Sequence, residues 1–138
     1  MSTNEHERIL VVDDNHIFRE TLAQRLRDAG YQVATAETGE SAFLALRDWS
    51  QPVDWLYTRA TLPRLIDGWI LADEYHDSHA GRAVIIAASE TRISRQGDII
   101  LQQPSLTTVL DTLRHAIDSA RSKMAAAPSN ASEQQRAA

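Results

Sequence analysis

The chain has 138 residues, of which 43% are hydrophobic and 24% are charged, and its formal net charge is −5. This length suits one folded domain with a buried core, and the acidic balance disfavours nonspecific binding to nucleic acid or to an anionic membrane. The longest apolar runs, ILVV and AVIIAA, are too short to cross a bilayer. The absence of cysteine excludes disulfides, thiol catalysis and cysteine zinc sites, and is typical of a cytoplasmic protein.

Short segments that are apolar or that alternate between apolar and polar residues predict five strands: residues 9–12, 31–37, 53–58, 83–88 and 98–101. Between and after them, apolar residues at helical spacing predict helices that begin after Asn15, near Gly39, at Gly68 and after Ser105. Strands that alternate with helices along a chain favour a parallel, doubly wound sheet with helices on both faces. We therefore predict an α/β fold.

The connection between the last two predicted strands is short. Nine residues lie between Ala88 and Asp98, whereas a parallel crossover with its helix normally takes at least about 10–12 residues. We expect the helix at this point, which would be the fourth, to be shortened or missing. Its loss would expose apolar surface for a partner or a second copy, unless side chains such as Ile93 and neighbouring loops fill the gap.

The end of the chain has a different composition. Its last residues, AAAPSNASEQQRAA, have no apolar periodicity. We predict a folded unit over residues 8–124 and a disordered polar tail over residues 125–138.

The order of motifs over residues 8–124 resembles the receiver domain of bacterial response regulators. ILVVDDN resembles the first strand and acid pair of that family, PVDWLY its third strand, and LP followed by DG the loop after that strand. A last strand that ends in QP lies where the family has Lys-Pro. The resemblance implies a flavodoxin-like sheet of five parallel strands in the order 2-1-3-4-5, and a role in signal transduction.

In that family the third strand ends on the aspartate that accepts phosphate. Counting five residues on from Asp54, and four back from Pro63, leads in both cases to Arg59. A guanidinium is cationic and is no nucleophile at neutral pH. The loop also carries one extra residue between Pro63 and Asp67 relative to the family, so its conformation is expected to differ.

Other positions of the family's site are changed as well. The hydroxyl residue that binds the phosphoryl group falls on Ala88, although a shift of one residue would bring in Ser89. The lysine before the proline reads Gln103, and the aromatic switch position reads Ile100. What remains of the site is the acid pair, Asp13 and Asp14.

Phosphoryl transfer to a receiver needs a carboxylate nucleophile, Mg²⁺ and donors to the phosphoryl oxygens. With Arg59 beside the acid pair, we expect Mg²⁺ binding to be weak or absent, and we predict no catalytic residue and no cofactor. We hypothesise that Arg59 replaces the metal ion by pairing with Asp13 or Asp14. The alternative is that Arg59 points into solvent at the end of the strand.

These observations favour a stand-alone, non-enzymatic pseudo-receiver that acts in two-component signalling by phosphorylation-independent contact with a histidine kinase or a downstream effector. A second copy could bind through residues 89–103 and the last helix, and we expect no nucleic-acid or membrane partner. One alternative is a working phosphorelay receiver with a displaced acceptor at Asp13, Asp14 or Asp67. Another is a small-molecule sensor that uses the Asp/Arg pocket at the carboxyl ends of the strands.

Two of the five histidines, His76 and His79, have i, i+3 spacing near the end of a predicted helix. Such a pair can bind metal, but polar residues at a helix end are more often solvated. We therefore predict that both lie on the solvated surface and that the chain has no metal site.

Overall fold

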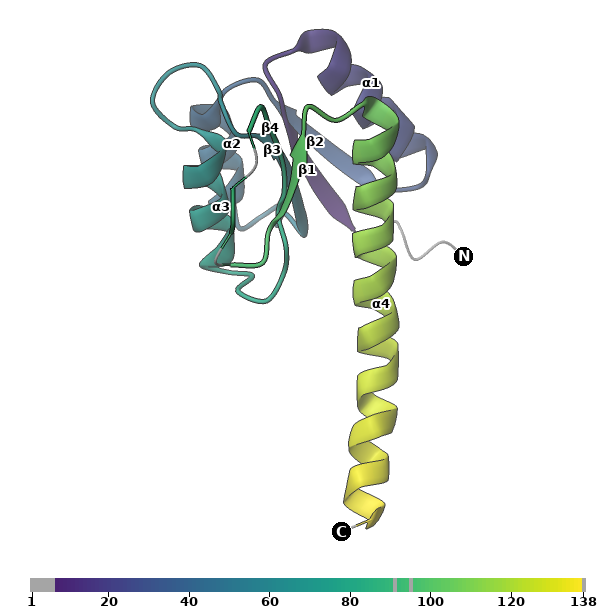
Figure 1. Cartoon of the computed structure of the whole chain (residues 1–138). Helices are drawn as coiled ribbons and strands as arrows, with labels where there is room; N and C mark the ends of the chain where they lie inside the picture. Colours follow the sequence, from purple (N-terminus) through teal and green to yellow (C-terminus); the bar gives the residue numbers. More distant parts are fainter. Residues whose placement is uncertain (1–6, 91, 95, 138) are drawn as a thin grey trace.

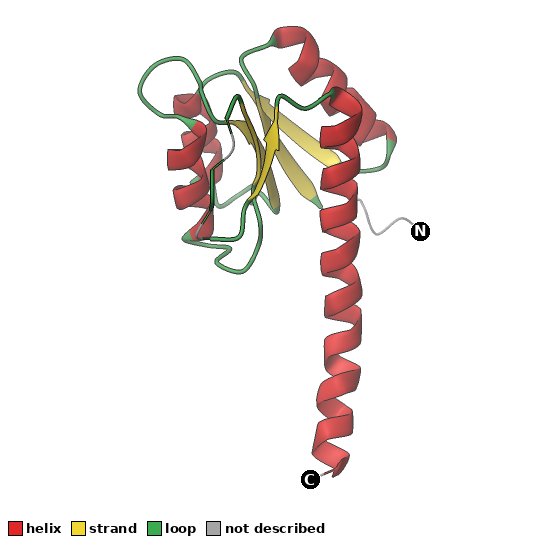
Figure 2. Cartoon of the chain, in the orientation of Figure 1, coloured by secondary structure: helices red, strands yellow, loops and turns green. Residues whose placement is uncertain are grey.

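The structure, a computed structural model, describes residues 7–90, 92–94 and 96–137, with side chains described as far as residue 123. Five strands and four helices follow one another along the described chain (Figures 1 and 2): β1 (Arg8–Val12), α1 (His16–Asp28), β2 (Gln32–Ala36), α2 (Gly39–Leu46), β3 (Trp55–Arg59), α3 (Gly68–His76), β4 (Ile85–Ala88), β5 (Ile99–Gln102) and α4 (Leu106–Ala137). The strands are all parallel and have the order β2-β1-β3-β4-β5, which confirms the predicted α/β fold.

Helices cover both faces of the sheet, because successive side chains of each buried strand point to opposite sides. On β1, Leu10 and Val12 pack in the core beneath α2 and α3, whereas Ile9 and Val11 pack beneath α1 and α4. Figure 1 shows α2 and α3 on one side of the strands and α1 and α4 on the other. The carboxyl ends of the parallel strands therefore meet at one edge of the sheet, where the loops carry the polar residues.

Each helix begins at a short polar residue that accepts a hydrogen bond from a backbone N–H of the first turn. Such caps satisfy donors that the helix itself cannot pair, so they define where each helix starts. The four capping residues are Asn15, Thr38, Asp67 and Ser105.

The connection between β4 and β5 contains no helix in its described residues, as its length predicts. Asp98 holds the end of this connection against the fold. Its carboxylate accepts hydrogen bonds from Nε2 of His76 at 2.7 Å and from the backbone N–H of Val84 at 2.9 Å. The hydroxyl of Ser94 donates to its other oxygen at 3.0 Å. The start of β5 is thereby tied to the end of α3.

Polar and stacking contacts, not apolar filling, attach the rest of the connection to α3. The guanidinium of Arg92 lies 3.7 Å from the centre of the Trp69 ring, and the amide of Gln96 donates to Asp73 at 2.7 Å. Ile93 is 93% exposed, so it does not fill the space that a helix would occupy. This segment therefore replaces the helix by lying along α3.

The prediction of a solvated surface was wrong for His76, which is buried against Asp98. His79 is half-buried, and its ring stacks on Tyr75 with the ring centres 4.5 Å apart. A helix-end position is compatible with burial here because the following segments fold back over the end of α3. Within the described residues, no group of three or more His, Asp or Glu side chains could hold a metal ion.

The last helix is longer than the sequence predicts. The backbone of α4 stays helical from Leu106 to Ala137, through the segment expected to be a disordered tail. Figure 1 shows this helix running well beyond the sheet. The boundary of the folded unit at residue 124 stays a prediction. No helix in the described part of the chain combines the length and hydropathy that crossing a bilayer requires.

Candidate functional site

A pocket of about 370 Å³ lies at the edge of the sheet where the strands end. It gathers residues from four strands or the loops that follow them, and it includes five of the residues singled out from the sequence. Its lining residues are Asp13, Phe18, Tyr57, Arg59, Ala87, Ala88, Ser89, Gln103 and Pro104. Parallel α/β sheets bind ligands at this edge, so the pocket is the candidate site.

Asp13 lies directly after β1 and is buried, with a relative exposure of 1%. One carboxylate oxygen accepts from the backbone N–H of Asn15 at 2.9 Å, and the other accepts from the hydroxyl of Tyr57 at 3.0 Å. Burial raises the pKa of Asp13, while these two donors and the charge of Arg59 act in the opposite direction. Both oxygens of the carboxylate are therefore already hydrogen-bonded by the protein.

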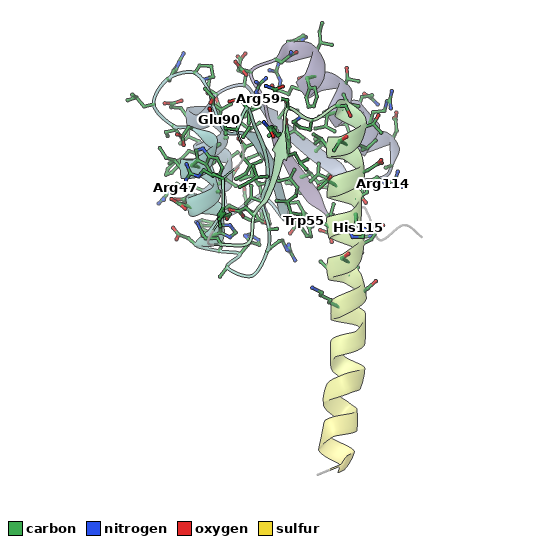
Figure 3. The ribbon with its side chains drawn as sticks, in the orientation of Figure 1. Arg47, Trp55, Arg59, Glu90, Arg114 and His115 are labelled. Atoms are coloured by element: carbon green, nitrogen blue, oxygen red, sulfur yellow. The ribbon has the colours of Figure 1, made fainter. Side chains whose placement is uncertain are left out.

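Arg59, which is labelled in Figure 3, ends β3. Its guanidinium lies near both carboxylates of the acid pair. Its Nη1 lies 3.7 Å from Oδ1 of Asp13, and its Nε lies 3.9 Å from Oδ1 of Asp14. These distances exceed a hydrogen bond, so the contacts are electrostatic. The side chain of Arg59 is 44% exposed and that of Asp14 45% exposed, so the guanidinium bridges one buried and one solvated carboxylate.

Tyr57 belongs to the site but was not singled out from the sequence. It is fully buried, stacks on Phe18 with ring centres 6.2 Å apart, and donates its hydroxyl to Asp13. Burial, followed by the charge of Asp13, raises the pKa of Tyr57 far above its ordinary value, so it remains a neutral donor. The sequence could have indicated Tyr57 as a site residue, because residues 57 and 59 of one strand point to the same face of the sheet.

The wall of the pocket that is formed by the end of β4 and the residues after β5 has no buried hydroxyl among its lining residues. Ala87 is the residue of β4 that pairs in register with Arg59, and both it and Ala88 line the pocket. Ser89 is exposed at the rim. Gln103 has a left-handed backbone with φ 43°, and its N–H donates to the carbonyl of Ala88 at 2.9 Å. The wall therefore offers one exposed hydroxyl and one exposed amide.

Two other residues from the sequence analysis lie outside this pocket. Ile100 packs against the core on the α2 and α3 side of the sheet. Asp67 caps α3, and its Oδ1 accepts from the backbone N–H of Ile70 at 2.9 Å. Asp67 therefore has a structural role at the start of α3.

The loop from β3 to α3 is held close to the strand end by a glycine. A Cβ added to Gly68 would lie 2.1 Å from the carbonyl oxygen of Arg59, so no larger residue fits without displacing the backbone. The extra loop residue is accommodated by Arg64, which has a left-handed backbone with φ 71°. Glu40 then accepts hydrogen bonds from the backbone N–H groups of Leu65 and Ile66, at 3.1 and 3.2 Å. These contacts fix the loop beside the pocket.

Comparisons with known proteins agree with this arrangement. Residues 9–102 match the family model described as the response regulator receiver domain. A response regulator receiver protein from Anaeromyxobacter sp. (strain Fw109-5) is 39% identical over 79 residues, which cover 57% of this chain and 32% of that protein. The matches span 32% and 18% of the lengths of the two curated relatives.

Solved receiver structures share the fold. A response regulator receiver protein from Sinorhizobium medicae WSM419 is 20% identical with a TM-score of 0.73, over 83% of this chain and 96% of that one. A CheY-like receiver domain protein from Methanospirillum hungatei JF-1 is 19% identical with a TM-score of 0.73, over 86% and 99% of the two chains. At these identities the likeness concerns the fold alone.

Proposed function

Because the chain belongs to the response regulator receiver domain family, a family of two-component signalling, we propose that it is a pseudo-receiver. It acts through contact with a protein partner and does not accept a phosphoryl group on the third strand. The observation that carries this proposal is the side chain of Arg59, which ends β3 and faces Asp13 and Asp14. A guanidinium at this position provides no oxygen to attack phosphorus.

The residues present do not suit the Mg²⁺ that receiver domains normally bind. Mg²⁺ requires near-octahedral oxygen ligands, and here the oxygens of Asp13 already accept from Asn15 and Tyr57. A metal ion beside Asp13 would also lie within reach of the positive charge of Arg59. In our proposal the guanidinium takes the electrostatic part of the metal ion, because its fixed positive charge offsets one of the two negative charges of the acid pair.

The remaining wall of the pocket supports the same proposal. Receivers need donors for the phosphoryl oxygens, and Ala87 and Ala88 supply no side-chain donor. The exposed Ser89 and Gln103 at the rim are not held toward Arg59 by any hydrogen bond of their side chains within the described residues. Asp67, one candidate for a displaced acceptor, is occupied as a helix cap.

A changed contact surface is expected to accompany the changed site. Receiver domains signal by contact with histidine kinases and effectors, and in this chain the described residues of the connection before β5 lie along α3 and form no helix. Ile93 is almost fully exposed in this connection, and Ile100 of β5 is only partly buried. We assign the partner contact, with an effector, a kinase or a second copy, to the face formed by residues 89–103 and α4.

The test uses beryllofluoride with Mg²⁺, which mimics a phosphoryl group on a carboxylate, and records amide spectra of the chain. We expect no shifts beyond those caused by ionic strength, and no rise in melting temperature with millimolar Mg²⁺. The matched variant is Arg59→Asp, which restores a third carboxylate and removes the cation. It should be less stable than the wild type without Mg²⁺ and should regain stability when Mg²⁺ is added.

Large wild-type shifts around residues 13–14 and 59–68 would show that the chain still accepts a phosphoryl mimic, and would overturn the pseudo-receiver proposal. Shifts centred on Asp14 alone would point to a displaced acceptor. A melting temperature of the wild type that rises with Mg²⁺ would exclude the role assigned to Arg59.

A further inference from the structure

A second pocket, of about 470 Å³, lies at the opposite end of the sheet from Arg59. It is bounded by the turn between α3 and β4, by the start of β3 and by the middle of α4. Its lining residues are Trp55, His79, Ala80, Gly81, Arg82, Ala83, Ala116, Ser119, Ala120 and Lys123. Figure 3 shows Trp55 beside α4, at the end of the sheet away from Arg59. The proposed signalling function assigns no ligand to this pocket.

The pocket has an apolar wall and small residues on its helical side. The indole of Trp55 is buried, with a relative exposure of 3%. Ala116 and Ala120, one turn apart on α4, are half-buried. Ala116, Ser119 and Ala120 are small, so this stretch of α4 leaves space beside the sheet. Its volume lies within the range of small-molecule sites, roughly 300–1,000 Å³.

Two permanent cations line the pocket without a carboxylate partner in the described part of the chain: Arg82 and Lys123. The guanidinium of Arg82 lies 4.5 Å from the centre of the Trp55 ring, and its Nη1 donates to the carbonyl oxygen of Asp54 at 2.8 Å. Both cations lie in one pocket, although the chain as a whole has a net charge of −5.

The carboxylates near this pocket are already engaged. Glu7 accepts from the indole N–H of Trp55 at 2.9 Å and pairs with Arg121 at 3.6 Å. The carboxylate of Asp54 accepts from the backbone N–H of Arg8 at 2.9 Å. Neither carboxylate forms an ion pair with Arg82 or Lys123 among the described residues, so an added anion can bind these two cations.

His79 contributes a polar group. Its Nδ1 is buried and has no hydrogen-bond partner among the described residues. Burial lowers the pKa of His79, and the positive charge of Arg82 lowers it further, so the ring is neutral at physiological pH. The ring of His79 therefore lines the pocket without adding positive charge.

We propose that this pocket binds a small aromatic anion, such as an aromatic carboxylate. The flat ring lies against the alanines of α4, and the acid group lies toward Lys123 and toward Arg82, whose guanidinium covers the Trp55 ring. A guanidinium suits a carboxylate because its planar N–H groups match both oxygens. Such a ligand contacts the α3–β4 turn and α4 at once, so its binding fixes this part of α4 against the sheet.

The test titrates the full chain with naphthoate and with indole carboxylate and follows amide shifts and melting temperature. Naphthamide, which has the same ring without the charge, is the ligand control. We expect saturable shifts in residues 79–83 and 116–123 with either acid, a rise in melting temperature, and binding of the amide weaker by about tenfold.

Variants separate the cations from general charge effects. Lys123→Gln should weaken naphthoate binding about three- to fivefold, since Lys123 is exposed and its ion pair is screened. Arg25→Gln removes the same charge from the exposed face of α1 and should leave binding unchanged. Ala120→Leu fills the pocket and should abolish binding, and its melting temperature without ligand shows whether α4 still packs.

Three outcomes would overturn the proposal. The first is the absence of saturable shifts with both acids at millimolar concentration. The second is equal affinity for the acid and the amide, which would make the pocket a nonspecific apolar gap. The third is a set of amide shifts centred on residues 13–14 and 59. An equal loss of naphthoate binding in Arg25→Gln and Lys123→Gln would count in the same way. None of these results bears on the phosphorylation test of Arg59.

Discussion

Replacing Arg59 by alanine tests whether the guanidinium stabilises the acid pair. Each of its contacts, at 3.7 and 3.9 Å, is worth about 4 kcal/mol of Coulomb energy at an effective dielectric constant of about 20, before desolvation is counted. Arg59 is 44% exposed and Asp14 is 45% exposed, so solvent screens much of this attraction. Asp13 stays buried and loses its counter-ion. We expect a net loss of about 1–2 kcal/mol in the free energy of unfolding.

The pH dependence of this loss identifies its cause. Burial raises the pKa of Asp13, and Arg59 opposes that rise, so the pKa should be higher still in Arg59→Ala. A carboxyl group with a raised pKa binds its proton more tightly in the folded state than in the unfolded state. Ionisation of that carboxyl group therefore lowers the free energy of unfolding as the pH rises through its pKa in the folded state. The variant should be less stable than the wild type at neutral pH and nearly equal to it in acid, where Asp13 is protonated.

Urea unfolding of both proteins between pH 4 and 8 measures this difference, with Arg25→Ala as the control for loss of an exposed arginine. That control should change the free energy of unfolding by less than about 0.5 kcal/mol. A variant at least as stable as the wild type at neutral pH would refute the reasoning. So would a deficit that stays constant into acid, because it would then come from packing.

Other substitutions test the contacts around the site and the helix-free connection. His76→Ala should lower the free energy of unfolding by about 2–4 kcal/mol, because the buried carboxylate of Asp98 loses a hydrogen-bond donor. In the same urea titration, Asp77→Ala at an exposed position should lower it by less than about 0.5 kcal/mol. Gly68→Ala should lower the free energy of unfolding by about 2–3 kcal/mol, since its Cβ would meet a backbone carbonyl at 2.1 Å. Gly81→Ala, which has open space around the added Cβ, should be close to neutral, and equal losses for the two glycines would contradict the steric argument. Tyr57→Phe should lower the free energy of unfolding, measured by calorimetry, by about 1–2 kcal/mol, because the buried carboxylate of Asp13 loses a hydrogen-bond donor. An unchanged melting temperature would count against a stabilising hydrogen bond between Tyr57 and Asp13.

Much of the fold could be predicted because the relevant signals are local. Apolar runs, helical spacing and capping residues each depend on a few neighbouring positions, and they located the strands and the starts of the helices. A count of the residues between Ala88 and Asp98 predicted that no full helix precedes β5, and the described residues of this connection form none. The length of α4 did not follow, because composition that lacks apolar periodicity does not by itself exclude a helical backbone.

The candidate site was predicted in part. Counting from Asp54 and from Pro63 placed Arg59 at the end of the third strand, and the parallel sheet made its proximity to the acid pair a reasonable hypothesis. The count could not show that the guanidinium spans both carboxylates at electrostatic rather than hydrogen-bonding distance. That depends on how far the side chain extends and on the space that neighbouring side chains leave.

Sequence by itself determined the order of the elements, the residue at the end of β3 and the absence of room for a helix before β5. Only the tertiary structure decided that Tyr57 donates to Asp13, across 44 residues of chain, and that His76 donates to Asp98, across 22. The physical reason is that periodicity and length constrain short stretches of backbone. A buried hydrogen bond between distant segments depends instead on the packing that brings one particular donor and acceptor together.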